Sequence, residues 1–141
     1  MATLVQRGGV TVKQMPSMDT WLREAKNHPD AHKVGIYLTH NGVVRRSARA
    51  LVRQGVTNAP AVKAMRFSYR PDLLEDIIAT ALTREGIYFV RVWLNEGTLQ
   101  VGDALMCILV GGDIRHRTLD CLDYLVGRIK NECVTEEEIY E

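Results

Sequence analysis

The spacing of apolar residues along the chain predicts a succession of strands and helices. Three runs are typical of strands: "AVKAMRFSY" (61–69), "IYFVRVWL" (87–94) and "ALMCILVGG" (104–112). The last run is apolar at nearly every position, which predicts a central strand that is buried on both faces. Apolar residues at helical spacing predict a helix over 71–82, a last helix that begins near Asp113 as its N-cap and extends to about 129, and a short helix over 17–27 with Ser17 as its N-cap.

Turn-forming residues separate these segments. Asn41-Gly42 interrupts "KVGIYLTHNGVVR" and predicts a hairpin, because both residues tolerate a positive φ. The pair Gly8-Gly9 separates two short expected strands in the same way. A polar loop (46–60) and a turn (97–103) are expected further along the chain, and the acidic tail (135–141) is expected to be exposed. The irregular order of strands and helices, with an antiparallel hairpin, favours the α+β class.

Composition limits the classes of function that need to be considered. The 141 residues fit a single domain spanning 1–141, with a real hydrophobic core. No apolar run reaches the roughly 18 residues of a membrane helix, and the N-terminus lacks the apolar core of a signal peptide. We therefore expect a cytoplasmic protein without a membrane segment. The formal net charge is only +1, so any anion-binding site must be a local feature.

The cysteines and histidines do not predict a metal site. The three cysteines contain no CxxC pair, and the four histidines do not have the spacing of metal ligands. We therefore expect no metal and no cofactor. The cysteines are expected to be small buried side chains in a reducing environment.

The segment "LVGGDIRHRTLDCLDYLVGRIK" carries candidate groups at both ends of an expected helix. Arg115, His116 and Arg117 lie at its start, where free backbone N–H groups and the helix dipole favour an anion. The alternative is an ordinary strand-to-helix turn with solvated arginines. Lys130 lies at the far end, where a lysine suits the dipole but could also act as proton donor, nucleophile or charge clamp.

Four arginines cluster in "VVRRSARALVRQ": Arg45, Arg46, Arg49 and Arg53. Nucleic acid is one possible ligand, but no aromatic residues are interleaved for base stacking, and the total charge is near zero. We therefore expect no nucleic-acid binding. A solvated loop with one functional arginine is the preferred interpretation of this cluster.

Residues 62–130 resemble the large, catalytic subunit of molybdopterin synthase. The stretch "GTLQVGDAL" matches the "GELWPGDEI" turn of that family, and "MCILVGGDIRHRTL" aligns without gaps to its next strand and "HRSSAF" helix start. Upstream, the family's "GTVR" turn matches the residues that end at Arg45. Counting along the last helix places the lysine of the family's "DYLK" motif at Lys130. Counted from the upstream turn at Gly42, the resemblance spans roughly the last three quarters of the chain, and it is specific in order and spacing.

This resemblance implies an α+β fold that contains an α/β hammerhead with a mostly antiparallel sheet, and a homodimer. It implies a partner, a small ubiquitin-like sulfur carrier whose Gly-Gly tail ends in a thiocarboxylate. The activity implied is transfer of sulfur to a cyclic pyranopterin monophosphate, which makes molybdopterin for the molybdenum cofactor. Arg45 and Arg115, with His116 close by, would bind substrate phosphate or polarise the thiocarboxylate, and Lys130 would be the catalytic lysine.

Three positions depart from the pattern of that family. Ile114 stands where the family has a histidine, Ser68 where it has a glutamate, and Glu137 where a second active-site lysine is expected. An anion in place of a cation would reverse the local field. The tail 131–141 is the divergent part of the chain. Two functions therefore stay open: sulfur transfer, or a non-catalytic relative that binds a pterin, a phosphate compound or the carrier without transferring sulfur.

The distance between the two ends of the last helix suggests how a site would be assembled. Arg115 and Lys130 are fifteen positions apart in the sequence. In a straight helix this separation corresponds to about 22 Å. The two side chains cannot reach one substrate within one chain unless the helix breaks. We therefore expect a site at a subunit interface, with Arg115 from one chain and Lys130 from its partner.

Overall fold

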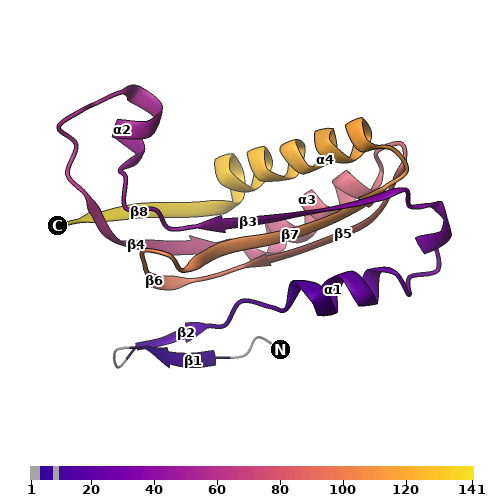
Figure 1. The fold of residues 1–141 in the computed structure, drawn as a ribbon, viewed down its shortest axis with the longest axis horizontal. Helices are drawn as coiled ribbons and strands as arrows, with labels where there is room; N and C mark the ends of the chain where they lie inside the picture. Colours follow the sequence, from indigo (N-terminus) through magenta and orange to yellow (C-terminus); the bar gives the residue numbers. More distant parts are fainter. Residues whose placement is uncertain (1–3, 8–9) are drawn as a thin grey trace.

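The computed structural model describes residues 4–7 and 10–141 and has helices on both faces of a central sheet (Figure 1). The strands are β1 (Leu4–Arg7), β2 (Val10–Lys13), β3 (Ile36–Val43), β4 (Val62–Tyr69), β5 (Ile87–Leu94), β6 (Gly97–Gln100), β7 (Ala104–Gly112) and β8 (Val134–Tyr140). The helices are α1 (Met18–Ala25), α2 (Arg49–Gln54), α3 (Pro71–Leu82) and α4 (Arg115–Arg128), with a 3-10 turn η1 (Ala31–Lys33) and a π-helical turn η2 (Ile129–Cys133). Every strand pairing among the described residues is antiparallel, which confirms the α+β class and the mostly antiparallel sheet.

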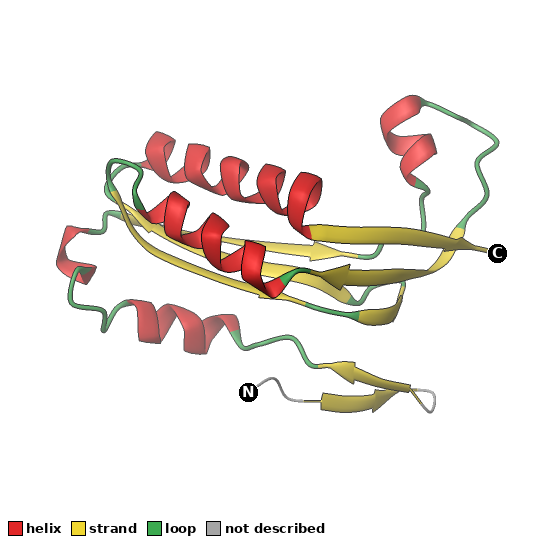
Figure 2. Cartoon of the chain, turned by 180° about the vertical axis from the view of Figure 1, so that it is seen from behind, coloured by secondary structure: helices red, strands yellow, loops and turns green. Residues whose placement is uncertain are grey.

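The central strand is β7, as its continuous apolar run predicts. It lies between β3 and β5 in a three-stranded sheet. Helices α3 and α4 cover one face of this sheet and α1 covers the other (Figures 1 and 2). Ile108 points into the main core, which also contains Leu125 and Ile129, while Leu109 packs toward Ala25 of α1. This alternation follows from the two-residue period of a strand.

A second three-stranded sheet, in the order β6-β4-β8, extends from the end of α4 (Figure 2). The turn η2 joins α4 directly to β8, so the C-terminal strand begins where the helix ends. Strand β8 pairs with β4 over most of its length, with Phe67 opposite Glu136 and Arg66 opposite Glu137. The second sheet therefore positions the residues that follow Lys130.

Several predicted elements are confirmed at their expected places. The strands over 87–94 and 104–112 and the helix that begins at Pro71 have the expected bounds. The Ser17 hydroxyl accepts a hydrogen bond from the backbone N–H of Thr20 and caps α1. The two short N-terminal strands, β1 and β2, also form. The expected turn at Gly8-Gly9 between them lies outside the described residues.

Two local predictions were wrong, and two were correct only in part. Asn41 and Gly42 do not form a hairpin but continue β3 opposite Cys107 and Met106, because pairing with the central strand outweighs the turn tendency. The expected loop 46–60 contains α2, which ends at Gly55 in the left-handed conformation (φ 68°). Within the expected turn, Gly97–Gln100 is strand β6, which pairs with β4, and only Val101 and Gly102 form the turn. The acidic tail forms strand β8, which also pairs with β4 and in which exposed and half-buried positions alternate.

The burial of the cysteines and the length of the helices agree with what the composition predicts. Cys107, Cys121 and Cys133 are all buried free thiols, as expected for small core side chains. Burial raises the pKa of the Cys107 and Cys121 thiols. None of the helices in the described ranges is both long enough and apolar enough to cross a membrane.

Candidate functional site

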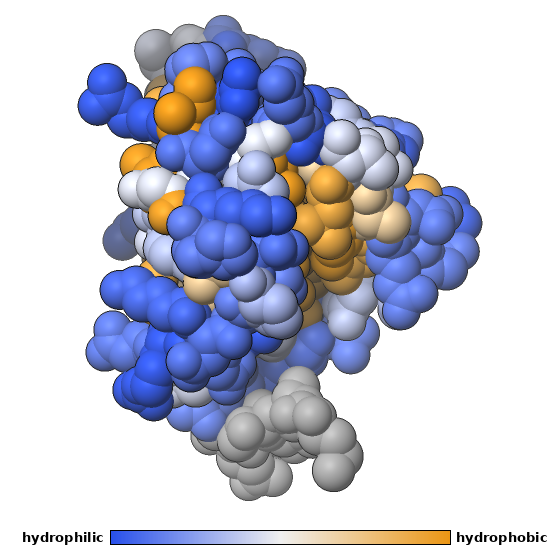
Figure 3. Space-filling model, turned by 90° about the vertical axis from the view of Figure 1, so that its right-hand side faces the viewer, coloured by the Kyte–Doolittle hydropathy of each residue, from blue (hydrophilic) through white to orange (hydrophobic). Residues whose placement is uncertain are grey.

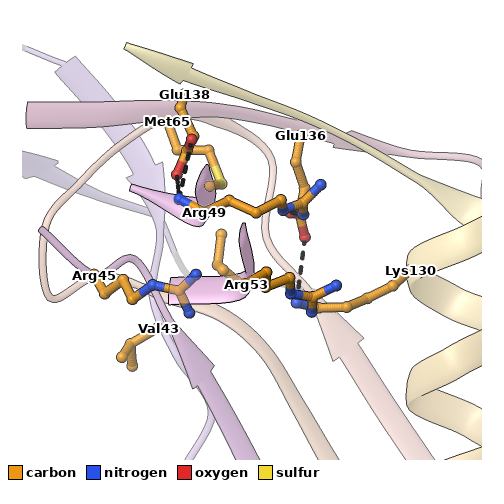
Figure 4. A pocket seen from close by; sticks show the side chains of 9 residues that line it. Val43, Arg45, Arg49, Arg53, Met65, Lys130, Glu136 and Glu138 are labelled. Atoms are coloured by element: carbon orange, nitrogen blue, oxygen red, sulfur yellow. Dashed lines mark hydrogen bonds and ion pairs between the residues drawn. The ribbon is translucent and has the colours of Figure 1, made fainter. Parts of the chain in front are cut away.

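A small charged cavity lies where α2, the end of α4 and the second sheet meet (Figure 4). Its volume is about 50 Å³. The lining residues are Val43, Arg45, Arg49, Arg53, Met65, Leu105, Lys130, Glu136 and Glu138. Four cations face two carboxylates here, so the cavity carries a positive charge although the whole chain is almost neutral. Such a site favours an anionic ligand.

Lys130 reaches this cavity from the π-helical turn η2, just beyond the end of α4. Its side chain is 31% exposed, and its Nζ lies 3.9 Å from Oε1 of Glu136. That distance is an ion pair but too long for a hydrogen bond. The ammonium group is therefore attracted toward the cavity without being fixed by a short contact.

Arg49 links α2 to strand β8 through two carboxylates. Its Nη2 donates to Oε2 of Glu136 at 2.5 Å, and its backbone N–H donates to Oε2 of Glu138 at 3.0 Å. The second bond satisfies a free N–H at the start of α2, where Ala48 supplies no side-chain cap. The two glutamates of β8 thus fix both the position of α2 and the direction of the Arg49 side chain.

Arg45 and Arg53 provide the two remaining cations. Arg53 lies four residues after Arg49 on α2, so both side chains project from the same face of the helix. Figure 4 shows Arg53 extended toward Lys130. Arg45 Nε donates to the carbonyl oxygen of Ser47 at 2.9 Å, which leaves its terminal nitrogens directed at the cavity. Among the ion pairs between described residues, none involves Arg53.

Glu136 has an unusual environment for a carboxylate. Its side chain is only 9% exposed, and its Oε1 atom has no hydrogen-bond donor among the described residues. A buried acceptor without a donor costs about 1–3 kcal/mol, so the cavity contains an unsatisfied group as well as positive charge. Oε1 is the atom that faces Lys130.

His40 is a further ionisable group close to Lys130. It lies on β3 and is half-buried. Burial, and to a lesser extent the positive charge of Lys130, lower the pKa of His40 below its ordinary value. The imidazole is therefore neutral at pH 7 and can accept a proton.

Arg115 and His116 lie at the opposite end of α4 from Lys130. Helix α4 is continuous from Arg115 to Arg128, so the fifteen-residue separation is not shortened by a break. Both side chains are exposed and do not line the cavity around Lys130. The structure thus brings Arg45 and Lys130 together within one chain but keeps Arg115 and His116 apart from them.

Glu137, where the resemblance places a second lysine of the family, does not line the cavity around Lys130. Glu137 lies on the outer face of β8 and pairs with Arg66 at 3.3 Å. Ser68, the other departure on this sheet, lines a shallow hollow on the same outer face. Because side chains alternate along a strand, the cavity receives Glu136 and Glu138 instead. The π-helical turn η2 sets which residues of β8 face the cavity. Counting along a regular helix does not predict this, because the π-helical turn changes the number of residues per turn.

The sequence placed Arg49 and Arg53 in a candidate cluster with only one functional arginine expected, and it did not identify Glu136 and Glu138 as groups of this cavity. The spacing of the two arginines was a usable signal, because residues four apart share a helix face, but the segment was expected to be a loop. The "TEEEIYE" segment was interpreted as a solvated tail. Its alternating exposure shows a strand with one face directed at the cavity.

The geometry defines an α+β protein with a cationic cavity that contains a lysine at the end of a core helix. A family model described as MoaE protein matches residues 13–132. The chain therefore belongs to the MoaE protein family, in agreement with the resemblance to the large subunit of molybdopterin synthase. A comparison with curated protein sequences gives no match.

Similar solved structures agree with this assignment. Molybdopterin synthase from Staphylococcus aureus is similar with a TM-score of 0.68 and 19% identity, covering 89% of this chain and 87% of that chain. Molybdopterin cofactor biosynthesis protein E from Burkholderia multivorans gives a TM-score of 0.66 at 18% identity, covering 91% and 84%. A complex of subunits 1 and 2 of molybdopterin-converting factor from Helicobacter pylori gives 0.63 at 12% identity, covering 89% and 80%. At these identities the likeness establishes the shared fold.

Proposed function

We propose that this protein acts in molybdenum-cofactor biosynthesis as a sulfur-transferring subunit of the molybdopterin synthase type. One observation carries the proposal: in a chain of the MoaE family, Lys130 and Arg45 line one cationic cavity. Both residues are also candidates from the sequence alone. A thiocarboxylate and a phosphate are anions, and a cavity with four cations and two carboxylates suits either of them.

The proposed mechanism uses the residues around Lys130. The thiocarboxylate tail of a small carrier enters the cavity, where Arg45 and Lys130 bind its anionic end. Lys130 then assists attack of the sulfur on the pterin substrate or release of the carrier. His40, neutral at pH 7, is a proton acceptor in the neighbourhood of Lys130 because its pKa is lowered. Stabilising negative charge in a preorganised site is the main contribution expected from such cations.

The proposed partners are a small ubiquitin-like carrier protein and a second copy of this chain. The similarity to one chain of the complex from Helicobacter pylori supports the carrier. The α4 start supports the homodimer, because Ile114 is 42% exposed and Leu119 47% exposed beside Arg115 and His116. Figure 3 views this end of the molecule, where a strip of apolar surface is exposed within a mostly polar face. Burying Ile114 and Leu119 against a partner would bring Arg115 and His116 of α4 into an interface.

The proposed substrate is a cyclic pyranopterin monophosphate, with its phosphate bound by Arg45 and by Arg115 and His116 of the second copy. This arrangement explains how residues at opposite ends of α4 can serve one substrate. The proposed location is the cytoplasm, where a carrier thiocarboxylate and free thiols are stable.

The test is a reconstituted sulfur-transfer reaction. The protein is incubated with a thiocarboxylated carrier and the cyclic pterin precursor, and the dithiolene product is measured. We expect product with the wild-type protein and a loss of at least about 100-fold with Lys130→Ala, because the cation acts on the reacting group itself. Arg128→Ala is the matched control: it removes a neighbouring cation that pairs with Glu132 and does not line the cavity.

Two outcomes would contradict the proposal. Wild-type protein that binds the carrier but makes no product would favour a non-catalytic relative. Full activity in Lys130→Ala would show that this cavity is not the reaction site.

A further inference from the structure

We propose that Glu136 is the general base that releases the carrier: it accepts a proton from the water molecule that hydrolyses the acyl–sulfur bond left by sulfur transfer. This inference rests on the proposed function, because it concerns the last step of that reaction. When the sulfur of a thiocarboxylate attacks a carbon of the pterin, the carrier's acyl group becomes joined to the pterin through a thioester. The sulfur reaches the product only when this acyl–sulfur bond is broken, so the site needs a group that activates water.

The lining of the cavity leaves two side chains as candidates for this base. Of the nine described residues that line it, three are apolar and four are cations, and the other two are Glu136 and Glu138. Both oxygens of Glu138 accept the backbone N–H of Arg49, and its Oε1 also accepts the hydroxyl of Tyr140. Glu136 Oε1 accepts no hydrogen bond from any described residue, although the side chain is only 9% exposed. His40, the other proton acceptor of this region, lies outside the lining.

The two oxygens of Glu136 have different surroundings, as a fixed general base requires. Oε2 accepts a hydrogen bond from the Arg49 guanidinium at 2.5 Å, which holds the carboxylate in place. Oε1 faces Lys130 and lies 3.9 Å from its Nζ (Figure 4). This distance is too long for a direct hydrogen bond, but one water molecule can lie within hydrogen-bond distance of both groups. A volume of about 50 Å³ is enough to hold such a water.

The proposed step balances without an oxidant or a reductant. The water oxygen attacks the acyl carbon while one of its protons passes to Glu136 Oε1, and the ammonium group of Lys130 stabilises the negative charge that develops on the acyl oxygen. The acyl–sulfur bond then breaks, and the sulfur leaves with the electron pair as a thiolate on the pterin. The carrier leaves with a carboxyl end. That carboxyl group and Glu136 each release one proton to the solvent, so the base is restored.

The experiment follows a single turnover and detects the thioester itself. The full-length protein is mixed with thiocarboxylated carrier and the cyclic pterin precursor, and the carrier is followed by intact-protein mass spectrometry. We expect the wild-type protein to yield free carrier with a carboxyl end. Glu136→Gln keeps an acceptor for Arg49 but removes the base. Carrier release should therefore slow about 100-fold, and the carrier should accumulate as a covalent adduct with the pterin.

Further measurements separate a missing base from a damaged cavity. Hydroxylamine cleaves thioesters directly, so it should release the carrier from the Glu136→Gln adduct as a hydroxamate. Glu136→Asp keeps a carboxylate and should release the carrier faster than Glu136→Gln. The matched control is Glu137→Gln, which changes the next residue of β8, a partner of Arg66 on the outer face, and should release the carrier at the wild-type rate. Thermal melting verifies that each variant is folded.

The results that would overturn the inference differ from those that would refute the proposed function. Release of the carrier by Glu136→Gln at the wild-type rate would overturn the inference alone, provided that the wild-type protein makes dithiolene. Loss of sulfur transfer in that variant without any adduct would do the same, because Glu136 would then act before the thioester forms. A wild-type protein that forms neither dithiolene nor adduct would refute the proposed function, and this inference with it.

Discussion

At the scale of single residues, the cavity depends on one buried carboxylate shared by two cations. Glu136 pairs with Arg49 through Oε2 and lies 3.9 Å from Lys130 through Oε1. Removing one partner of a buried ion pair leaves an uncompensated charge. The loss of folding free energy is then larger than the stabilisation that the pair itself contributes. The acidic residues of β8 are therefore best understood as part of the site, although the position selected from the sequence was Glu137.

The pKa of His40 predicts a dependence of stability on pH. Burial and Lys130 lower this pKa in the folded protein, while the unfolded chain has the ordinary value of about 6.5. Below that pH the unfolded chain binds more protons, so the contribution of His40 is fully present above pH 6.5 and is lost as the pH falls through the folded-state pKa. We expect the free energy of unfolding to decrease between about pH 7 and pH 5, and part of this decrease to disappear in His40→Gln.

Urea denaturation at a series of pH values measures this effect. The control is His116→Gln, which removes an exposed histidine at the other end of the protein and should keep the wild-type curve. Identical pH dependence in wild type and His40→Gln would show that His40 is not held in its neutral form.

At the scale of elements, the junction between β7 and α4 determines where the last helix lies. A Cβ at Gly112 would come within 2.3 Å of Thr118 Oγ1 and 3.1 Å of the Gly86 carbonyl oxygen. Thr118 is fully buried, and its hydroxyl donates to the carbonyl oxygen of Ile114 at 2.8 Å, so it cannot move freely. The close approach of helix and strand at this point requires a glycine.

Two glycine substitutions test this packing in opposite directions. We expect Gly112→Ala to lower the free energy of unfolding by about 1–3 kcal/mol, because the added methyl group forces a shift in a packed core. Gly127→Ala should raise it by up to about 1 kcal/mol, because nothing lies within 4 Å of the new methyl group in α4 and alanine favours the helix. Chemical denaturation measures both. Equal effects of the two substitutions would refute the packing argument.

The same elements show what the sequence could predict and what it could not. Strongly patterned segments such as "IYFVRVWL" were predicted to the residue, because their apolar spacing reflects burial in the sheet. Asn41-Gly42 and the acidic tail were misassigned, because pairing with β7 and β4 is a long-range contact that overrides local tendency. In the site, Arg45 and Lys130 were predicted through the family resemblance. Arg53 could not be placed in the site without knowing that 49–54 is a helix, and Glu136 could not be placed without knowing the π-helical turn η2. Only the structure provides both.

At the scale of the whole molecule, the charged groups are divided between two ends of one helix. The chain has a net charge of +1, yet cations concentrate in the cavity around Lys130 and again at the start of α4. In a two-fold symmetric homodimer, the start of α4 of each chain would approach the cavity of the other chain. Each of the two sites would then contain the cations around Lys130 and those at the start of α4. We propose such a dimer because it would allow Arg115 and Lys130 to act on one substrate.

Complementation between two inactive variants tests this claim most directly. Lys130→Ala and Arg115→Ala proteins are each assayed for dithiolene formation, then unfolded together, refolded as a mixture and assayed again. If each site takes Lys130 from one chain and Arg115 from the other, half of the dimers are mixed and each mixed dimer has one intact site. We then expect recovery of about a quarter of the wild-type activity. Activity of the mixture that stays at the average of the two separate variants would contradict the shared site.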